Sequence, residues 1–127
     1  MSRTRFPKAI VAAIDAGMIL GVRAGDEHRF IGIWAVVADG RVFVRSWGLT
    51  RRGWHQALVD DARGAIQVGD RELLCRAVPA RGERTKEAVD RAYREKYHTK
   101  ASLKWVRGFE RGRRRDGTLE LVPRSSR

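Results

Sequence analysis

The sequence predicts a mainly β fold with helices, a small antiparallel barrel of six strands, and three observations support this prediction. Short apolar segments separated by turn residues recur along the chain, as in antiparallel sheets. Asp39-Gly40 lies between two of these segments and predicts a tight hairpin, because both central residues of such a turn need a positive φ, which Asp and Gly tolerate. Helical segments interrupt the strands irregularly, which favours a barrel over a parallel α/β fold.

The expected strands are the apolar segments that end in Gly, Asp or other turn residues. They are 18–22, 28–38, the return strand of the hairpin after Gly40, 65–68, 73–78 and 118–122. The segment 28–38 is apolar on both faces, which is typical of a strand that is covered on both sides. We therefore expect it to be one continuous strand that lies within a barrel wall or beneath a partner.

Helical periodicity predicts two or three helices. A short amphipathic helix spans 6–16, with Pro7 in its first turn, and one or two turns follow at 54–59. The strongest pattern begins at Thr85, the expected cap, and carries an apolar stripe. The stripe consists of Ala88, Val89, Ala92, Tyr93 and Tyr97, and Asp90 and Arg94 are expected to pair as neighbours one turn apart. We expect 99–116 to be a loop with a helical turn around Trp105.

The totals indicate one compact domain. We expect it to cover 1–124 and to be followed by a frayed tail, 125–127. Cys75 is the only cysteine, so no intrachain disulfide is possible, and a reduced, cytoplasmic setting is expected. No segment is apolar enough to span a bilayer, and the N-terminus lacks the pattern of a secretion signal.

The net charge of +12 and the pI of about 11.3 are compatible with a polyanionic partner such as nucleic acid. The excess is uneven, because the segment 81–127 contributes most of it and 111–115 reads RGRRR. A basic arm of this kind can neutralise phosphates, and a solvated loop would have the same composition. The three histidines show no metal-ligand spacing, so no metal site is expected.

The most informative candidate site is the segment that follows the hairpin. In the return strand, alternation places Arg45 and Ser46 on opposite faces. The loop after it concentrates hydroxyl groups, guanidinium groups and glycine amides before a helix begins at Trp54. Phosphate binding needs such groups, and Trp47 and Trp54 could pack against a flat ring. A solvated basic loop with two packed tryptophans is the alternative.

The chain resembles a family of uncharacterised bacterial proteins in the FMN-binding split-barrel superfamily, the pyridoxamine 5′-phosphate oxidase-like proteins. The resemblance runs nearly end to end. Its clearest pieces are IWAVVADGRVFVRSWG at 33–48, GWHQAL at 53–58, GAIQVG at 64–69, AVDRAYREKYH at 88–98 and TLELVPR at 118–124.

The resemblance implies a six-stranded antiparallel split barrel, a homodimer, and a cofactor in a cleft at the subunit interface. It implies that the phosphate of FMN is held by basic and hydroxyl residues on the central strands and the following loop. These positions correspond here to Arg45, Ser46, Thr50, Arg51 and Arg52, with Arg29 as an addition at the start of the preceding strand.

The resemblance also contains a departure and leaves the cofactor open. The Arg-x-Val-Leu-Leu-Lys strand signature of the oxidases is replaced by Arg29-Phe-Ile-Gly-Ile-Trp34, without the terminal Lys. Trp54, followed by a short helix, is similar to the pattern of deazaflavin-dependent reductases, and other members of the superfamily bind haem or nothing. No side chain is identified as a proton donor, so the catalytic residues stay unknown.

The sequence therefore leaves three functions open. The first is a flavin-type cofactor-binding protein, with FMN or a deazaflavin coenzyme, that acts as an oxidoreductase. The second is a polyanion- or nucleic-acid-binding module. The third is a split barrel that binds no cofactor.

Overall fold

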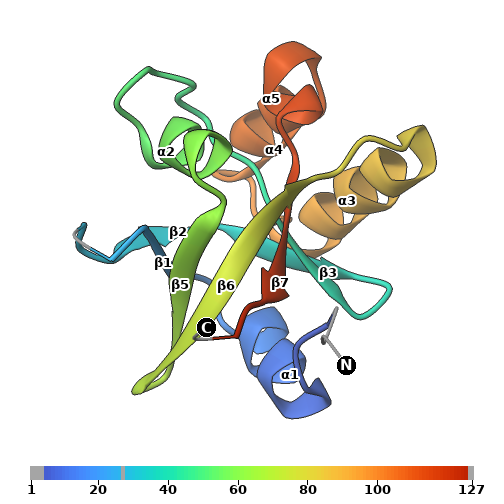
Figure 1. The fold of residues 1–127 in the computed structure, drawn as a ribbon. Coiled ribbons are helices and arrows are strands. Elements are labelled where there is room, and N and C mark those ends of the chain that lie inside the picture. The colour runs from blue at the N-terminus through green and yellow to red at the C-terminus, as the bar shows by residue number, and fades with distance from the viewer. Residues whose placement is uncertain (1–4, 27, 126–127) are drawn as a thin grey trace.

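Seven antiparallel strands form a single sheet in the part of the chain that the computed structural model describes, residues 5–26 and 28–125 (Figure 1). The order across the sheet is β2-β1-β5-β6-β7-β4-β3. The strands are β1 (Leu20–Ala24), β2 (Ile31–Ile33), β3 (Ala35–Ala38), β4 (Arg41–Val44), β5 (Arg63–Val68), β6 (Arg71–Pro79) and β7 (Leu119–Pro123). The two edge strands, β2 and β3, are consecutive in the sequence and only Trp34 separates them, so the sheet is nearly closed into a barrel.

The hairpin predicted at Asp39-Gly40 is confirmed. Asp39 and Gly40 have φ values of 53° and 70°, and Ala38 pairs with Arg41 on the opposite side of the turn. Both residues thus adopt the left-handed conformation that a two-residue hairpin needs. The turn joins β3 to β4 and so fixes the direction of β4, which Arg45 and Ser46 of the candidate site follow directly.

The prediction of one continuous strand over 28–38 is wrong, because the segment divides at Trp34. Ile33 pairs with Leu20 of β1, whereas Ala35 pairs with Val44 of β4. The segment passes from one edge of the sheet to the other, and each half packs against a different neighbour. Ile33, Ala35 and Val37 belong to the apolar cluster inside the barrel, whereas Trp34, Val36 and Ala38 belong to a second cluster outside it, so both faces are apolar. The division at Trp34 gives the structure seven strands where the sequence predicts six.

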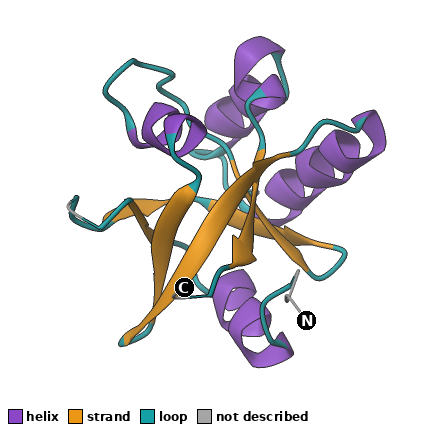
Figure 2. Ribbon diagram, in the orientation of Figure 1, coloured by secondary structure: helices purple, strands orange, loops and turns teal. Residues whose placement is uncertain are grey.

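Five helices accompany the sheet among the described residues, and Figure 2 shows that they lie outside it. They are α1 (Lys8–Ala16), α2 (Trp54–Asp60), α3 (Glu83–Lys96), α4 (Leu103–Phe109) and α5 (Gly112–Asp116). α1 lies at one end of the sheet, and α2, α4 and α5 lie at the opposite end (Figure 1). The latter three helices surround the segment that leaves β4.

Two details of the predicted helices are wrong. α3 begins before Thr85, and the flanking residue at its N-terminus is Gly82, so Thr85 lies inside the helix. The segment 99–116, predicted as a loop with one helical turn, forms α4 and α5. Its weak periodicity follows from the shortness of these helices, since α4 buries only Val106 and Phe109.

The apolar side chains form two clusters. One fills the barrel and includes the α1 residues Ile10 and Ile14. The other lies between the outer face of the β3–β4 hairpin and the helices α3 and α4, and it contains Val89, Tyr93 and Tyr97 from the predicted stripe. α3 is thereby attached to the strand that carries the candidate site.

Three further predictions concern single features. Cys75 is a free, fully buried thiol. Arg124 donates hydrogen bonds to the carbonyls of Cys75 and Gly64, so the chain is attached up to that residue, and most of the predicted tail, 126–127, lies outside the described residues. No helix within the described ranges is long and apolar enough to cross a membrane.

Candidate cofactor-binding cleft

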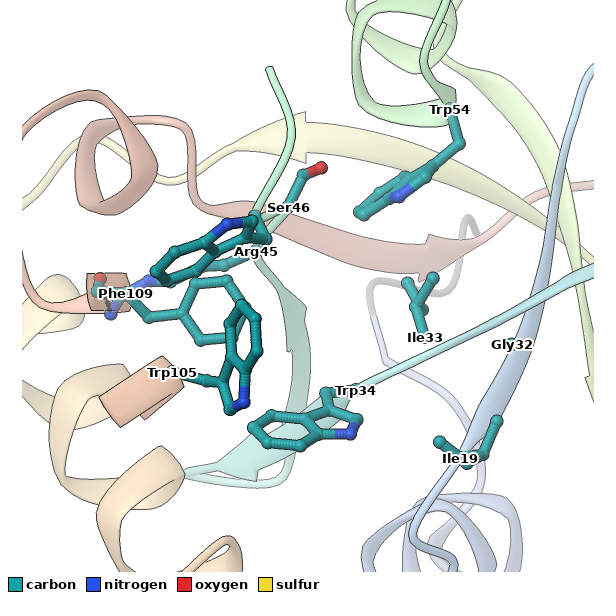
Figure 3. Close-up of a pocket in the computed structure, with 10 residues that line it drawn as sticks. Ile19, Gly32, Ile33, Trp34, Arg45, Ser46, Trp54, Trp105 and Phe109 are labelled. Carbon is teal, nitrogen blue, oxygen red and sulfur yellow. Dashed lines mark hydrogen bonds between the residues drawn. The ribbon is translucent and has the colours of Figure 1, made fainter. Parts of the chain in front are cut away.

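An open cleft of about 280 Å³ lies beside the β2–β3 junction, where the loop after β4 approaches α2 and α4 (Figure 3). All four tryptophans of the chain line it, namely Trp34, Trp47, Trp54 and Trp105. The other lining residues are Ile19, Gly32, Ile33, Arg45, Ser46 and Phe109. Four different segments of the chain thus contribute one indole each, and the walls are predominantly aromatic.

Contacts between rings hold this aromatic wall in place. Trp34 stacks on Tyr97, the residue that follows α3, with ring centroids 4.1 Å apart and planes inclined by 5°. Trp47 meets Trp105 edge to face at 4.7 Å and Phe109 at 6.0 Å. Such pairs each contribute roughly 0.5–1.5 kcal/mol beyond the burial of their surface. These contacts fix the positions of Trp34, Trp47 and Trp105 relative to α4 and the C-terminal end of α3.

Gly108 of α4 permits the close approach of Trp47. A Cβ atom at this position would overlap ring carbons of the Trp47 indole. Glycine is unfavourable inside a helix by roughly 1 kcal/mol relative to alanine, so its presence here has a packing reason. The absence of a side chain at Gly108 allows the indole of Trp47, which lines the cleft, to lie against the backbone of α4.

A second cavity of about 190 Å³ adjoins the first and shares Trp54 with it. Among its lining residues are Arg29, Arg52 and His28, together with the α2 residues Trp54 and Ala57. Arg29 and Arg52 are both exposed, and 23 positions separate them in the sequence. The structure thus brings two of the predicted phosphate-binding residues to one cavity beside the aromatic cleft.

The other predicted loop residues take different positions. Ser46 lines the aromatic cleft, and its buried hydroxyl donates a hydrogen bond to the carbonyl of Gly48. Thr50 and Arg51 are exposed in the loop and belong to neither cavity. A contact between these two side chains and a ligand would require the loop to change its conformation.

Arg45 has a role that the sequence did not predict. Its side chain is fully buried and donates to the carboxylate of Asp90 at 2.6 Å, the hydroxyl of Thr118 at 2.8 Å and the carbonyl of Phe109 at 2.8 Å. A fourth hydrogen bond, at 3.1 Å, goes to the carbonyl of Lys86. Phosphate binding by this guanidinium, as predicted, would require these bonds to break. In the structure Arg45 joins β4 to α3, α4 and β7.

Asp90 completes this buried ionic group. Its second carboxylate oxygen accepts a hydrogen bond from Nε of Arg115 at 2.9 Å, and Arg115 also pairs with Glu83 at 2.7 Å. The predicted pairing of Asp90 with Arg94 is therefore wrong, and Arg94 instead pairs with Glu110 at 2.8 Å. The Asp90 carboxylate points inward because two guanidinium groups from distant segments converge on it.

The cleft offers little acid–base chemistry of its own. Its lining contains no Asp, Glu, His, Lys, Cys or Tyr side chain among the described residues. Behind the wall, burial raises the pKa of Tyr97 to about 12, and burial also raises the pKa of Tyr93, so both phenols stay protonated at neutral pH. A reaction in this cleft would therefore depend on a bound group for its chemistry.

Sequence reasoning missed several residues of this cleft. Trp34 was assigned to the inside of a strand and Trp105 to an isolated helical turn, while Ile19, Ile33 and Phe109 were not singled out. The available signal was the number of tryptophans, because four large amphipathic rings in 127 residues often include a binding surface. Within 5–26 and 28–125, no group of three or more His, Cys, Asp or Glu is arranged to hold a metal ion.

Solved structures share this fold at low sequence identity. A conserved hypothetical protein from Mycobacterium tuberculosis aligns over 99% of this chain and 84% of its own, with a TM-score of 0.58 and 12% identity. A FAD-binding protein from Mesorhizobium loti aligns over 98% and 94%, with a TM-score of 0.55 and 12% identity. A candidate pyridoxamine 5′-phosphate oxidase from Listeria innocua aligns over 92% of both chains, with a TM-score of 0.56 and 14% identity.

These likenesses confirm the split-barrel fold that the sequence resemblance implies, with seven strands in place of six. No curated protein shows significant similarity to the sequence. A family model described as "Uncharacterized protein conserved in bacteria (DUF2255)" matches residues 11–121. This match covers most of the chain, and the protein therefore belongs to this bacterial family of split-barrel proteins.

Proposed function

We propose that the protein binds a flavin-type cofactor, FMN or a deazaflavin coenzyme, with the ring system in the aromatic cleft, and that it acts as an oxidoreductase. The convergence of all four tryptophans on one open cleft carries this proposal. Small-molecule sites are concave, mostly apolar and largely preformed, and flat conjugated rings stack well on indoles. The Mesorhizobium loti protein, similar in fold, is described as FAD-binding, which supports a flavin over other ring systems.

The neighbouring cavity supports the phosphate part of the proposal. Arg29 and Arg52 line it, and Trp54 separates it from the aromatic cleft. Neither cavity alone exceeds the lower end of the usual range for ligand pockets, roughly 300 Å³, so a cofactor of flavin size would extend over both. The ring would then lie among the indoles, and the phosphate would contact the two guanidinium groups.

A homodimer is part of the proposal, with the cofactor at its interface. Several apolar side chains at the cleft and beside it are exposed, among them Ile19 at 59% and Met18 at 53%, just before β1, and Ile31 at 37% on β2. Large apolar side chains grouped at a cleft mouth are typical of surfaces that a partner covers. A second copy placed over them would shield the bound ring from water, and light scattering of the purified protein should give twice the mass of one chain.

The residues that line the cleft indicate what the bound cofactor and the protein would each contribute to the reaction. A bound flavin supplies the transfer of electrons or hydride, and the protein supplies binding, orientation and exclusion of water. Among the described residues that line the cleft, Ser46 alone carries a hydroxyl group, and this group donates its hydrogen bond to the carbonyl of Gly48. The side chains of this cleft would therefore position the ring and the substrate, while protons come from the cofactor, the substrate or solvent.

The test compares FMN with riboflavin, which has the same ring and lacks the phosphate. Fluorescence titration of the wild type should show tighter binding of FMN, and Arg29→Gln/Arg52→Gln should remove that preference. Each lost charge-assisted hydrogen bond corresponds to about 1.5–3 kcal/mol, so affinity for FMN should fall by tenfold or more while riboflavin binding is unchanged. Trp54→Ala should weaken both ligands.

The matched control is Arg71→Gln/Arg76→Gln, which removes the same charge from exposed positions of β6. It should leave both affinities as in the wild type. A deazaflavin coenzyme is titrated in parallel. Absence of saturable binding of FMN and of the deazaflavin coenzyme by folded protein would refute the proposed function. An equal loss in the control would show that net charge alone attracts the phosphate.

A further inference from the structure

The segment 99–117, which forms α4, α5 and their connections, is strongly basic. It contains seven Lys and Arg residues and only two acids, Glu110 and Asp116. Lys104 and Arg107 lie one turn apart on α4, and the run 111–115 leads through α5. The positive charge that this segment presents to solvent therefore depends on whether the two acids pair with cations of the segment itself.

Both acids pair with cations of α3 instead. Glu110 binds Arg94 at 2.8 Å, and Asp116 binds Lys86 at 3.2 Å. Of the seven cations of the segment, only Arg115 forms an ion pair within the described residues, with Glu83 and Asp90. Six cations therefore stay without a carboxylate partner: Lys100, Lys104, Arg107, Arg111, Arg113 and Arg114.

Half-exposed indoles lie among these cations. The guanidinium carbon of Arg114 lies 3.7 Å from the centre of the Trp47 ring, and its Nε donates a hydrogen bond to the carbonyl of Trp47 at 2.8 Å. The ammonium group of Lys104 lies 4.9 Å from the Trp105 ring. Trp47 and Trp105 are 39% and 38% exposed. Two of the unpaired cations, Lys104 and Arg114, thus each lie against an exposed indole.

We propose that the 99–117 segment is a binding surface for single-stranded nucleic acid. The unpaired cations would neutralise successive phosphates, and the flat surfaces of Trp105 and of the Arg114 guanidinium stacked on Trp47 would accept bases. Proteins that bind single strands without sequence preference combine these two elements, a basic track for the backbone and aromatic or guanidinium planes for the bases. This surface shares Trp47 and Trp105 with the aromatic cleft, and it does not include Arg29 and Arg52, which line the second cavity.

Two other polyanionic partners fit the surface less well. A lipid bilayer would require an apolar face for insertion, but the apolar residues Val106 and Phe109 of α4 are buried against the core. Duplex nucleic acid keeps its bases stacked on each other, so it would use the cations and leave the indole and guanidinium planes without a partner. The combination therefore favours a single strand.

The experiment measures binding of a fluorescein-labelled oligothymidylate to the full chain by anisotropy at several salt concentrations. The test variant is Lys104→Gln/Arg107→Gln/Arg113→Gln, three exposed positions of the segment. The control is Arg71→Gln/Arg76→Gln/Arg81→Gln, which removes the same charge from exposed positions elsewhere. Each phosphate contact contributes about −0.7 to the slope of log K against log salt. The slope should become shallower by about 2 in the test variant and stay unchanged in the control.

A second measurement compares the affinity of the protein for three polyanionic partners. Affinity for the oligothymidylate should exceed that for a duplex of equal length and for vesicles of anionic phospholipid, and Trp105→Ala should weaken the single strand more than the duplex. Equal losses in both triple variants, stronger binding of the vesicles or the duplex, or no retention of the single strand at low salt would each overturn it. Circular dichroism of every variant shows that the fold is intact.

Discussion

Replacing Arg45 by Met should lower the free energy of unfolding by about 3–5 kcal/mol, because one member of a buried ionic group is removed. Met keeps most of the apolar stem and deletes the guanidinium. The bonds lost are those to Asp90, to Thr118 and to the carbonyls of Phe109 and Lys86. The change therefore tests whether Arg45 is a structural residue or a ligand of phosphate.

The magnitude follows from what each acceptor retains. Asp90 keeps Arg115 as a partner at 2.9 Å, and Thr118 still bonds the carbonyl of Arg115. The carbonyl of Phe109 at the end of α4 loses its buried donor. Hydrogen bonds to charged groups contribute about 1.5–3 kcal/mol each, and the desolvation penalty of the buried guanidinium offsets part of this gain. A net loss in the stated range results, equivalent to a fall in Tm of roughly 10–20 °C for a chain of this size.

The assay is urea unfolding followed by circular dichroism and tryptophan fluorescence, with Arg71→Met on the exposed face of β6 as the control. Asp90→Asn should destabilise by a similar amount, and the double variant should cost less than the sum of the two single changes because the residues share one interaction. A loss below about 1 kcal/mol for Arg45→Met would refute the structural role, as such values are typical of exposed ion pairs. Unchanged stability with loss of FMN binding would restore the predicted phosphate contact.

Three further predictions use other parts of the structure. Gly108→Ala should destabilise by about 1–3 kcal/mol and alter the near-ultraviolet circular dichroism of Trp47, although alanine is the better helix former, whereas Gly48→Ala, where the added methyl group meets open space, should be neutral. Because burial raises the pKa of Tyr97 to about 12, its stabilising contribution is complete below the unfolded pKa of 10 and is lost as pH rises toward 12; urea unfolding of Tyr97→Phe should show a smaller decline over that window. Burial raises the pKa of Cys75 to about 12, so iodoacetamide should label it slowly in native protein at pH 8 and rapidly in urea, and equal rates would show that the thiol is accessible.

Local chemistry explains which parts of the fold could be predicted. The turn at Asp39-Gly40 needs two left-handed residues, a requirement that the sequence meets within two positions. The stripe of α3 likewise lies within one helix, and Val89, Tyr93 and Tyr97 are buried as predicted. Features whose causes lie within a few residues are visible in the sequence.

The errors have causes that lie far apart in the sequence. The division of 28–38 at Trp34 depends on β1 and β4, the two strands with which its halves pair. Alternation along 28–38 shows only that both faces are covered, and it does not show that the two halves pair with different strands. The sequence therefore predicts six strands, whereas the structure, in which this segment forms two strands, has seven.

The candidate site shows the same limit. Arg45 was predicted as a phosphate ligand from its loop, but its partners Asp90 and Thr118 are 45 and 73 positions away. Charge pattern alone cannot show which guanidinium is buried. The approach of Trp34 and Trp105 to the loop tryptophans is likewise a product of the closed sheet and of α4 packing.

A flavin-type ring held in the cleft formed by the four tryptophans should remain with the protein during gel filtration. The visible spectrum of the protein is recorded after incubation with FMN and gel filtration, and the measurement is repeated with the deazaflavin coenzyme. One of the two cofactors should elute with the protein, in a ratio near one per chain and with quenched tryptophan fluorescence. Elution of both entirely in the small-molecule fraction, from protein whose circular dichroism shows an intact fold, would contradict the proposed cofactor binding.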